Sequence, residues 1–488
     1  MYYIGIDLGT TNIKAALYRG DMTRADLRSL PVEYFRDGIF VEFDAEDYFR
    51  RLCSLVNGML KDRAIDPAEV RVITLTGQAE TLIVLGRDGK PLRRAISWMD
   101  ERSTEECAFL QERFTPEEIE SVTGQMAVLP TWPATKILWL RRHEPETYAS
   151  AAHYVLLKDY IVYRLTGRLE SDMSIATFSF YFDIYQKCYW RKMTETVGIR
   201  PEQLPPLAEP LTEAGPLTAE AASLLGLTRA TRINRGTLDH FAGMIGTGNT
   251  APGQLTLSTG TVMALSAMTA EPCPRDSGIA MHYGFLPDTH IMLPVAESGG
   301  VSLEWFRQNC LSGMDYGRLN EELSRRSLPN RLIFLPFLVG TNAPDFDADA
   351  SGLFYGLRAE NDSVDMAAAV MEGVSFLLRK NCEAIRKSGT GVSRIIATGG
   401  GSKSALWCQM QADITGLPVV VPAEKEAACL GAALAGAVGD GLFPDLASGA
   451  ASCVSFAGCF TPHPTEALDR KYRQYQLLYD AMLRAARL

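Results

Sequence analysis

Short apolar runs at the start of the chain predict strands. Residues 2–6 (YYIGI) and residues 13–18 (IKAALY) are apolar runs of strand length. Residues 7–12 then form a tight connection, and they contain Asp7 and the pair Gly9-Thr10. One carboxylate and a small polar turn therefore interrupt an otherwise buried hairpin.

Apolar positions at helical spacing predict helices further along. After Asp44, a plausible N-cap, such positions are Phe49, Leu52, Val56 and Leu60. The C-terminal stretch repeats this spacing with Leu468, Tyr472, Tyr475 and Tyr479, which predicts an amphipathic helix packed on a domain. Strands that alternate with helices predict an α/β protein.

A similar hairpin pattern returns at half the chain length. Residues 254–265 read QLTLSTGTVMAL, again a strand, a Gly-Thr turn and a strand, and Gly260-Thr261 lies 251 residues after Gly9-Thr10. A repeat at this period predicts two related domains, although two unrelated hairpins would give the same few residues. The Gly/Pro-bearing stretch 245–252 suits a hinge, so we expect domains at 1–247 and 248–488.

The two Gly-Thr turns suggest phosphate binding. Small residues let backbone N–H groups approach an anion closely, and Thr10 and Thr11 add hydroxyl donors. Asp7, at a strand end, could hold Mg²⁺ through water, because Mg²⁺ prefers oxygen ligands and keeps several waters. The alternative is that Asp7 only caps the turn by hydrogen bonding to its own backbone.

A third glycine cluster favours a nucleotide. Residues 394–401 (RIIATGGG) predict a strand that ends in three glycines, and SKSALWCQMQADITG predicts a helix directly after it. A strand, a glycine turn and a helix N-terminus form a nucleotide-binding arrangement. Together with the two Gly-Thr hairpins, this cluster indicates a bound nucleoside polyphosphate.

Composition and charge limit the class of partner. The chain has 488 residues, of which 47% are apolar and 22% charged, as in an ordinary soluble globular protein. Its net charge is −10, so nothing indicates a nucleic-acid surface, which needs a clustered basic excess. An acidic protein that binds phosphates must neutralise them locally, with backbone N–H groups, a metal or a few placed cations.

Cysteines and apolar runs indicate a cytoplasmic protein. The ten cysteines are scattered without a CxxC pair, which fits reduced and mostly buried thiols. The six histidines lack metal-ligand spacing. No apolar run reaches the roughly 18–20 residues needed to span a bilayer. The N-terminus has no basic region of a signal peptide.

The ordered set of motifs resembles the FGGY carbohydrate kinases of the actin-like ATPase superfamily, nearest the xylulokinase branch. The resemblance runs nearly end to end. IDLGTT alone is weakly specific, because Hsp70-type chaperones carry nearly the same run, whereas the set of six is specific. In chain order the segments are IGIDLGTTNIKAAL, GQAETLIVLGRDGKPLRRAISWMDER, GTLDHFAGMIGTG, STGT, GLFYGLRAENDSVDMAAAVMEG and ATGGGSKSALWCQMQADITG.

The resemblance implies a fold and a reaction. The implied fold is two actin-like (ribonuclease H-like) domains with a nucleotide cleft between them. The implied reaction is transfer of the γ-phosphoryl group of MgATP to a hydroxyl of a sugar or polyol, with closure about the 245–252 hinge expelling water. Family members are often dimers, and the resemblance carries a homodimer over as an expectation.

The resemblance implies that Asp239 in GTLDHFAG is the catalytic residue. Phosphoryl transfer has a loose transition state, so the protein mainly positions the acceptor and screens charge. A carboxylate near the acceptor orients the hydroxyl and takes its proton late, as a general base. The alternative is that Asp239 is the N-cap of a helix that begins at His240.

ATP contacts fall by resemblance on residues from both halves of the chain. Asp7 would lie near Mg²⁺ and the γ-phosphate, and Lys14 either adds charge there or is a surface residue of its strand. The remaining phosphate contacts are Gly9, Thr10, Thr11, Asn12, Gly260 and Thr261. The adenosine pocket is expected at Gly300, Glu304, Gly400, Gly401 and Ala405.

The acceptor site is expected around Gln78, Glu80, Trp98, Asp239 and His240. Glu80 can accept hydrogen bonds from two neighbouring hydroxyls, and Trp98 can offer an apolar face to sugar C–H groups or simply pack in the core. His240 can donate to a sugar hydroxyl or only orient Asp239. We also expect an ion pair of Asp100 and Arg102 to organise the wall of the acceptor site that Trp98 forms.

This chain differs from both glycerol kinases and xylulokinases at positions that bear on the choice of substrate. Glycerol kinases typically read Gln-Arg-Glu-Thr where this chain has Gln78-Ala79-Glu80-Thr81, with Gln after the catalytic aspartate and a Tyr near the position of Thr131. Xylulokinases typically read Gly-Gln-Met-His-Gly, with Asn after that aspartate. Here Glu80 stands at their His position and His240 follows Asp239. The pattern suits a polyhydroxylated acceptor, such as a ketopentose, and does not name one.

Other classes remain as alternatives. A polyol kinase for glycerol or erythritol shares the same motifs. An actin-like switch or chaperone would need an added peptide-binding domain, for which the chain has no room, and it would leave Asp239, Glu80 and Trp98 unexplained. A catalytically inactive regulator is disfavoured by the retained Asp7 and Asp239.

Overall fold

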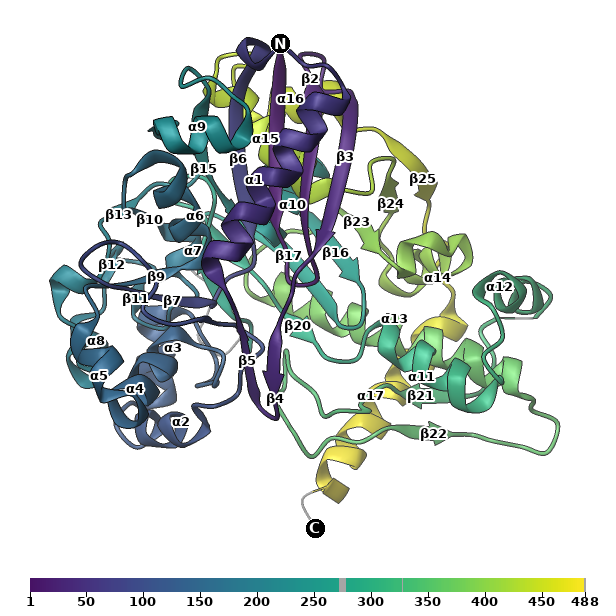
Figure 1. The fold of residues 1–488 in the computed structure, drawn as a ribbon. Helices are drawn as coiled ribbons and strands as arrows, with labels where there is room; N and C mark the ends of the chain where they lie inside the picture. The colour runs from purple at the N-terminus through teal and green to yellow at the C-terminus, as the bar shows by residue number, and fades with distance from the viewer. Residues whose placement is uncertain (272–277, 327, 487–488) are drawn as a thin grey trace. The chain divides into compact units, whose positions relative to one another are not determined.

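The computed structural model describes residues 1–271, 278–326 and 328–486 and divides into two compact units (Figure 1). Unit 1 consists of Met1–Thr250, Met281–His290 and Glu426–Val454. Unit 2 consists of Ala251–Ala280, Ile291–Lys425 and Ser455–Leu488. The first change of unit lies within the stretch 245–252. The division at 1–247 and 248–488 did not include the two later segments that return to unit 1.

The main sheet of unit 1 has the strand order β14-β15-β6-β1-β2-β3. Strand β1 (Tyr2–Leu8) is antiparallel to β2 (Asn12–Arg19) and parallel to β6 (Val70–Gly77). Strand β6 is in turn parallel to β15 (Arg232–Leu238). The two strands expected at residues 2–6 and 13–18 are confirmed, and both extend slightly further.

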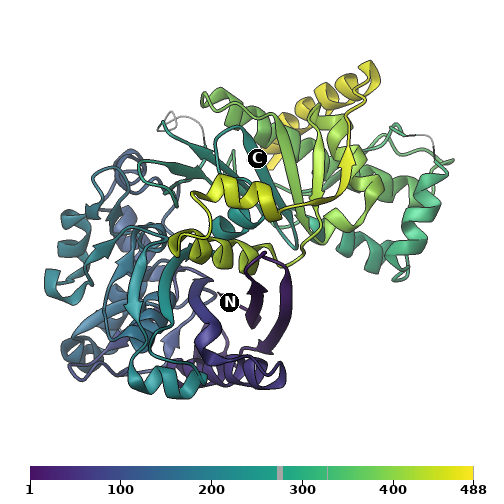
Figure 2. The ribbon, with the colours of Figure 1, turned by 90° about the horizontal axis from the view of Figure 1, so that it is seen from above.

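Helices α1 (Ala45–Asp62) and α15 (Ala427–Gly439) cover opposite faces of this sheet. Ile4 and Ile6 belong to the same buried cluster as Phe49 of α1. The intervening Gly5 points to the other face, because side chains alternate along a strand. A Cβ atom at Gly5 would lie 2.0 Å from the Cys429 carbonyl oxygen of α15. Figure 2 shows this yellow-green helix beside the purple N-terminal strands.

Helix α1 begins as its sequence predicts. The Asp44 side chain accepts a hydrogen bond from the Asp47 N–H, which caps the helix N-terminus. All four expected apolar residues of α1 are buried. Helix α15 was not expected, and it is rich in alanine and glycine, which lets it lie close to the sheet backbone.

The remaining elements of unit 1 include the edge strands β3 and β14 of this sheet, and most of the others form smaller layers around it. A second sheet has the order β4-β5-β8-β7-β9. The strands are β3 (Arg24–Pro31), β4 (Phe35–Asp37), β5 (Phe40–Phe43), β7 (Leu82–Leu85), β8 (Ala95–Ile96), β9 (His153–Leu156), β10 (Ser171–Asp172), β11 (Phe182–Asp183), β12 (Cys188–Tyr189), β13 (Leu207–Ala208), β14 (Glu213–Pro216) and β18 (Met281–Tyr283). The helices are α2 (Thr104–Gln111), α3 (Pro116–Thr123), α4 (Pro133–His143), α5 (Pro145–Ser150), α6 (Leu157–Thr166), α7 (Met173–Ala176), α8 (Arg191–Val197), α9 (Ala219–Leu225), α10 (Asp239–Gly246) and α16 (Leu446–Cys453).

Unit 2 contains the second hairpin. Strand β16 (Gln254–Thr259) is antiparallel to β17 (Met263–Thr269) and parallel to β23 (Arg394–Gly399). This arrangement repeats that of β1, β2 and β6 in unit 1, so the half-chain repeat corresponds to one shared strand pattern. The expected strand before the glycine cluster is confirmed as β23.

Helix α17 (Glu466–Ala486) closes the chain and packs on unit 2, where its four expected apolar residues are buried. The other strands are β19 (His290–Met292), β20 (Val295–Ala296), β21 (Ile333–Leu335), β22 (Leu353–Tyr355), β24 (Val419–Pro422) and β25 (Phe456–Phe460). The other helices are α11 (Gly300–Cys310), α12 (Tyr316–Ser324), α13 (Ser363–Lys387) and α14 (Ala405–Thr415).

Two further expectations concern thiols and membranes. The nine cysteines of the described ranges are free thiols, and five of them are buried; Cys273 lies outside those ranges. Across the part of the chain that the structure describes, every helix is too short or too polar to span a bilayer.

Candidate active site

The carboxyl ends of three parallel strands gather the candidate catalytic residues of unit 1. Strands β1, β6 and β15 end in register, with Leu8 paired to Gly77 and Gly77 paired to Leu238. The residues that follow or end these strands therefore meet at one sheet edge, the usual ligand site of an open α/β sheet. This edge brings together Asp7, Gly9, Gln78, Glu80 and Asp239.

Asp239 is the first residue of helix α10. Its Oδ1 atom accepts a hydrogen bond from the N–H of the next residue, His240, at 2.6 Å. The N-cap of α10 is Leu238, which makes no side-chain cap, so the alternative of Asp239 as the N-cap of a helix that begins at His240 is wrong. Burial raises the pKa of Asp239, while the neighbouring His240 lowers it. A raised pKa makes a carboxylate a better proton acceptor. The contact with His240 is therefore compatible with the base role.

Asp7 has an oxygen with no protein partner. Its Oδ1 is buried and accepts no hydrogen bond from the described residues. Burial, and after it the charge of Asp239, raises the pKa of Asp7 to about 7. Two carboxylates that repel each other at a buried edge favour a cation there. Asp7 is thus suited to bind a metal ion, and not to cap its own turn.

Lys14 is engaged within unit 1. Its Nζ lies 2.6 Å from Oε2 of Glu426, the residue before α15. Burial lowers the pKa of Lys14, but the hydrogen bond and charge of Glu426 outweigh it and the pKa is raised; the Lys14 charge in turn lowers the pKa of Asp7. Lys14 is therefore one member of a charged pair beside Asp7. Sequence reasoning missed Glu426, because it lies more than 400 positions away in the chain.

The turn between β1 and β2 requires glycine at one position. A Cβ atom at Gly9 would lie 2.6 Å from the Asn12 carbonyl oxygen. The Thr10 carbonyl accepts from the Tyr34 hydroxyl at 2.8 Å, and the Thr11 carbonyl accepts from the Val32 N–H at 2.9 Å. The turn is thus compact, and its backbone is held by hydrogen bonds from Tyr34 and Val32.

Glu80 has an unusual backbone conformation and a buried cationic neighbour. Its φ angle is +66°, a region that L-residues seldom adopt and that costs on the order of 1–3 kcal/mol. The Lys136 Nζ of α4 donates to the Glu80 carbonyl at 3.2 Å and to the Ser97 carbonyl at 2.8 Å. This ammonium group therefore fixes the loop that carries Glu80.

The Glu80 carboxylate is tuned by opposing charges. Burial raises its pKa to about 7, the Lys136 charge and a hydrogen bond with Thr131 lower it, and Asp239 raises it. Burial likewise lowers the pKa of Lys136. Lys136 was missed because a lysine inside the apolar stretch ATKILWL carries no spacing signal for a site 56 residues earlier.

The wall around Trp98 is built as expected. The Arg102 Nη2 lies 2.7 Å from Asp100 Oδ2, and both side chains are buried. The Asp100 carboxylate also accepts from the Val41 N–H at 2.6 Å. Trp98 itself is 36% exposed, which excludes the alternative of a core tryptophan.

One further histidine, His282, lies near the start of helix α10, where its ring is 6.4 Å from that of Phe241. His240 is exposed, whereas His282 is buried, and its ring stacks on Phe178 at 4.3 Å. Gln125 Nε2 lies 3.2 Å from His282 Nδ1, and its second contact to the Thr177 carbonyl orients the amide as donor. Burial and the charge of His240 lower the pKa of His282 to about 3, which favours the neutral ring. The Nε2 atom has no partner among the described residues.

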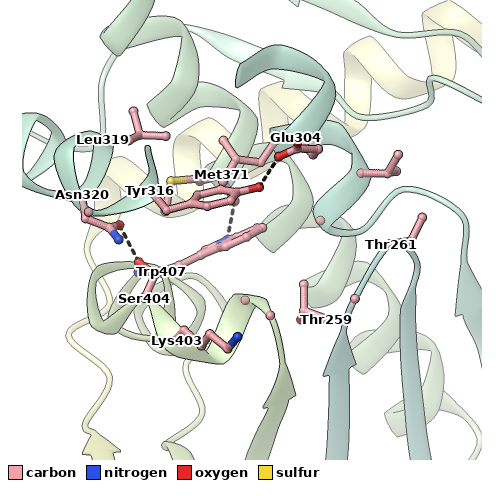
Figure 3. A pocket seen from close by; sticks show the side chains of 17 residues that line it. Thr259, Thr261, Glu304, Tyr316, Leu319, Asn320, Met371, Lys403, Ser404 and Trp407 are labelled. Atoms are coloured by element: carbon pink, nitrogen blue, oxygen red, sulfur yellow. Dashed lines mark hydrogen bonds between the residues drawn. The ribbon is translucent and has the colours of Figure 1, made fainter. Parts of the chain in front are cut away.

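Unit 2 contains a cavity of about 610 Å³ (Figure 3). Six of the residues predicted for ATP line it: Gly260, Thr261, Gly300, Glu304, Gly400 and Gly401. The N-terminus of helix α11 opens on it at Gly300, and a helix N-terminus favours an anion. Gly300 N–H donates to the Gly260 carbonyl at 2.8 Å, a close approach that a Cβ atom would block.

Aromatic and polar side chains complete the cavity. Figure 3 shows the rings of Tyr316 and Trp407 as part of the lining. The Tyr316 hydroxyl donates to Glu304 at 2.6 Å, and hydrogen bonds from Arg307 and Tyr316 lower the pKa of Glu304 to about 2. Lys403 is a cation at the same cavity, which sequence reasoning missed although it lies only two residues after the last of the three glycines.

Ala405 is not among the residues that line this cavity, contrary to the expectation. Ser404 caps helix α14 by accepting from the Trp407 N–H, and both residues line the cavity. Positions three apart share one helix face, whereas Ala405 is turned by about 100° from Ser404. The exposed Ala405 therefore lies on a different face of α14.

The donor set limits the kind of metal site. Within residues 1–271, 278–326 and 328–486, no group of three or more His, Cys, Asp or Glu side chains could hold a metal ion. A cation that binds through a single carboxylate, water and phosphate oxygens matches the preference of Mg²⁺.

Comparison with known proteins agrees with this class of site. Residues 2–246 match the N-terminal domain model of the FGGY family of carbohydrate kinases, and residues 255–439 match the C-terminal domain model. The chain therefore belongs to the FGGY family of carbohydrate kinases, phosphotransferases with an alcohol group as acceptor.

Kinases named for different substrates are similar to nearly the whole chain. Xylulose kinase of Bacillus subtilis (strain 168) is 28% identical over 484 residues, which are 98% of this chain and 95% of that protein. The structure of xylulose kinase from Rhodospirillum rubrum has a TM-score of 0.94 at 25% identity and covers 100% of both chains. The structure of gluconate kinase from Lactobacillus acidophilus has a TM-score of 0.90 at 26% identity, over 99% of this chain and 97% of that one.

Proposed function

We propose that this kinase phosphorylates a hydroxyl of a ketopentose such as xylulose, with Asp239 as general base. The observation that carries the proposal is the grouping of Asp239, Asp7 and Glu80 at one sheet edge, where the charge of Asp239 raises the pKa of both Asp7 and Glu80. The names of the Bacillus and Rhodospirillum relatives support a ketopentose as acceptor.

In the proposed reaction, the acceptor hydroxyl oxygen attacks the γ-phosphorus of ATP. The bond from that phosphorus to the bridging oxygen breaks, ADP leaves, and the hydroxyl proton passes to Asp239. Asp239 orients the hydroxyl before transfer and takes the proton late, because the transition state is loose. Glu80 accepts hydrogen bonds from other hydroxyls of the acceptor and holds the acceptor in position beside Asp239.

The residues of unit 1 fit a magnesium ion. Asp7 presents a buried oxygen without a protein hydrogen bond, and a cation there would relieve the repulsion between Asp7 and Asp239. Asp7 would hold the ion through water, with Gly9, Thr10, Thr11 and Asn12 around the phosphates. When bound, Mg²⁺ supplies charge neutralisation for the phosphate oxygens.

The cavity of unit 2 is assigned to the adenosine part of ATP. Its size lies within the range of small-molecule sites, and its lining combines aromatic rings, glycine backbone and few polar groups. Thr259, Gly260 and Thr261 lie at the end of β16 on the same cavity, so they are suited to contact the phosphates.

Valine at Gly260 tests this assignment. A Cβ atom there meets no atom closer than the Val262 carbonyl oxygen at 4.0 Å, so the fold tolerates it while the side chain enters the cavity. We expect the KM for ATP to rise roughly tenfold or more, about 1.4 kcal/mol, with the KM for the acceptor unchanged. Gly391→Val is the matched control, because Gly391 has open space and lies outside the lining. An unchanged KM for ATP in Gly260→Val would contradict the assignment.

The acceptor is tested by ADP release from MgATP against a panel of D- and L-ketopentoses, 6-deoxyketoses, gluconate, erythritol and glycerol. We expect strong turnover with one ketopentose, because Glu80 and Asp239 both serve a polyhydroxylated acceptor. Turnover with glycerol or erythritol alone would assign the chain to the polyol kinases instead. Turnover with gluconate alone would agree with the name of the Lactobacillus relative and reject the ketopentose.

A further inference from the structure

Hydrogen bonds join the acceptor residues of unit 1 to the turn between β1 and β2, residues 9–12, which we call the phosphate turn. Gln78 Nε2 donates to the Gly9 carbonyl at 3.4 Å, and Gln78 Oε1 accepts from the Thr81 hydroxyl at 2.9 Å. The Thr81 hydroxyl oxygen also accepts from the Trp98 backbone N–H at 3.2 Å. The Trp98 indole Nε1 donates to Thr10 Oγ1 at 2.9 Å. The chain of contacts therefore leaves the turn at Gly9 and returns to it at Thr10.

The bond from Trp98 fixes the role of the Thr10 hydroxyl. A hydroxyl group has one proton and two acceptor lone pairs, and the indole N–H uses one lone pair of Thr10 Oγ1. The proton is then left to donate in another direction. The Thr10 carbonyl is held separately by the Tyr34 hydroxyl at 2.8 Å. Thr10 is thus anchored through both its side chain and its backbone.

Trp98 can serve two functions with different parts of its ring. The side chain is partly exposed, so its apolar face is accessible to an acceptor, while the N–H edge is bonded to the turn. Trp98 follows strand β8 and Thr10 follows strand β1, 88 positions apart in the chain. Nothing local in the sequence predicts the contact.

We infer that Trp98 is a positioning residue for phosphoryl transfer: its indole N–H orients the Thr10 hydroxyl toward the transferred phosphoryl group. The inference rests on the proposed function, and it assigns Trp98 a second role beyond packing on the acceptor. An acceptor that packs on the Trp98 ring thereby steadies the phosphate turn through one hydrogen bond.

Phenylalanine at position 98 separates the two roles, because it keeps an apolar ring and removes only the N–H group. For Trp98→Phe we expect kcat to fall about 3- to 10-fold, as for the loss of one hydrogen bond. The KM for the acceptor should stay within about twofold. Trp98→Ala removes the ring as well, and its acceptor KM should rise.

Thr10→Val tests whether the effect passes through Thr10. If it does, the double variant Trp98→Phe/Thr10→Val should have the kcat of Thr10→Val alone, because the second change removes the same contact. Thr10→Ser keeps the hydroxyl and should retain the sensitivity to Trp98→Phe. Fully multiplicative effects of the two single changes would overturn the inference.

Hydrogen exchange of the free protein provides a readout that needs no acceptor. Trp98→Phe should speed exchange of the amides of residues 9–12, and Trp305→Phe should not. Trp305 is the matched control because its side chain is 42% exposed on helix α11 of unit 2. Unchanged exchange in Trp98→Phe would refute the anchoring.

Failure of the inference differs from failure of the proposed function. If wild type phosphorylates an acceptor but Trp98→Phe leaves kcat unchanged, the positioning role is wrong and the kinase assignment stands. If wild type phosphorylates no acceptor of the panel, the proposed acceptor class fails. The rate of ATP hydrolysis with water as acceptor then replaces kcat, and the same 3- to 10-fold loss is expected.

Discussion

Asp239→Asn is expected to lower kcat by about 10²- to 10⁴-fold, which is the usual loss when a general base is removed. Asparagine is nearly isosteric and keeps an oxygen that can accept from the His240 N–H, so the start of α10 is preserved. It cannot take the acceptor proton. The measurement is steady-state ADP release with the acceptor identified by the panel.

Nucleotide binding and folding should be preserved in this variant. The charge of Asp239 raises the pKa of both Asp7 and Glu80, so its removal relieves repulsion among half-buried carboxylates. The melting temperature should therefore be unchanged or higher, and ADP should bind as in wild type. Asp445→Asn is the matched control, because Asp445 caps α16 in the same unit. Near-normal turnover of Asp239→Asn would remove Asp239 from the base role.

Gly431→Ala is expected to destabilise the protein by about 3 kcal/mol or more, the upper range for overpacking a core. A Cβ atom at Gly431 would lie 1.8 Å from the Ala242 carbonyl oxygen and 2.7 Å from the Gly246 nitrogen. Both atoms belong to the backbone of α10, so no side chain can move aside. Because α10 begins at Asp239, we also expect kcat to fall. Thermal unfolding and turnover measure the two effects.

The control is an alanine at a helical glycine with free space. A Cβ atom at Gly58 in α1 would meet no atom within 4 Å. Gly58→Ala should stabilise the protein by about 0.5–1 kcal/mol through the higher helix propensity of alanine. If Gly431→Ala were also stabilising, α10 and α15 would not pack as closely as their backbones indicate.

Local patterns predicted much of the fold. Strands β1, β2, β16, β17 and β23 and helix α1 were predicted because alternation, helical spacing and capping are properties of neighbouring residues. The candidate ATP residues of unit 2 were instead carried over from the family resemblance, with the glycines after β23 as the local support. Their common cavity includes Gly260, Gly300 and Gly400.

The side-chain contacts of the site could not be predicted from the local sequence. Lys136 reaches the Glu80 carbonyl from 56 positions away, and His282 reaches Gln125 from a segment that returns to unit 1. Ala405 was assigned to the adenosine pocket by the family resemblance. The start of α14 at its N-cap Ser404 sets the face on which Ala405 lies, and the sequence did not predict that start.

The sequence by itself determined which segments form strands, turns and helices, and which residue types could carry phosphoryl transfer. The tertiary structure decided which of them meet. It placed helix α15 against Gly5 and Gly246, and it bonded Trp98 to Thr10. The physical reason is that hydrophobic periodicity reports which face of an element is buried, whereas the partner of that face depends on the packing of the whole unit.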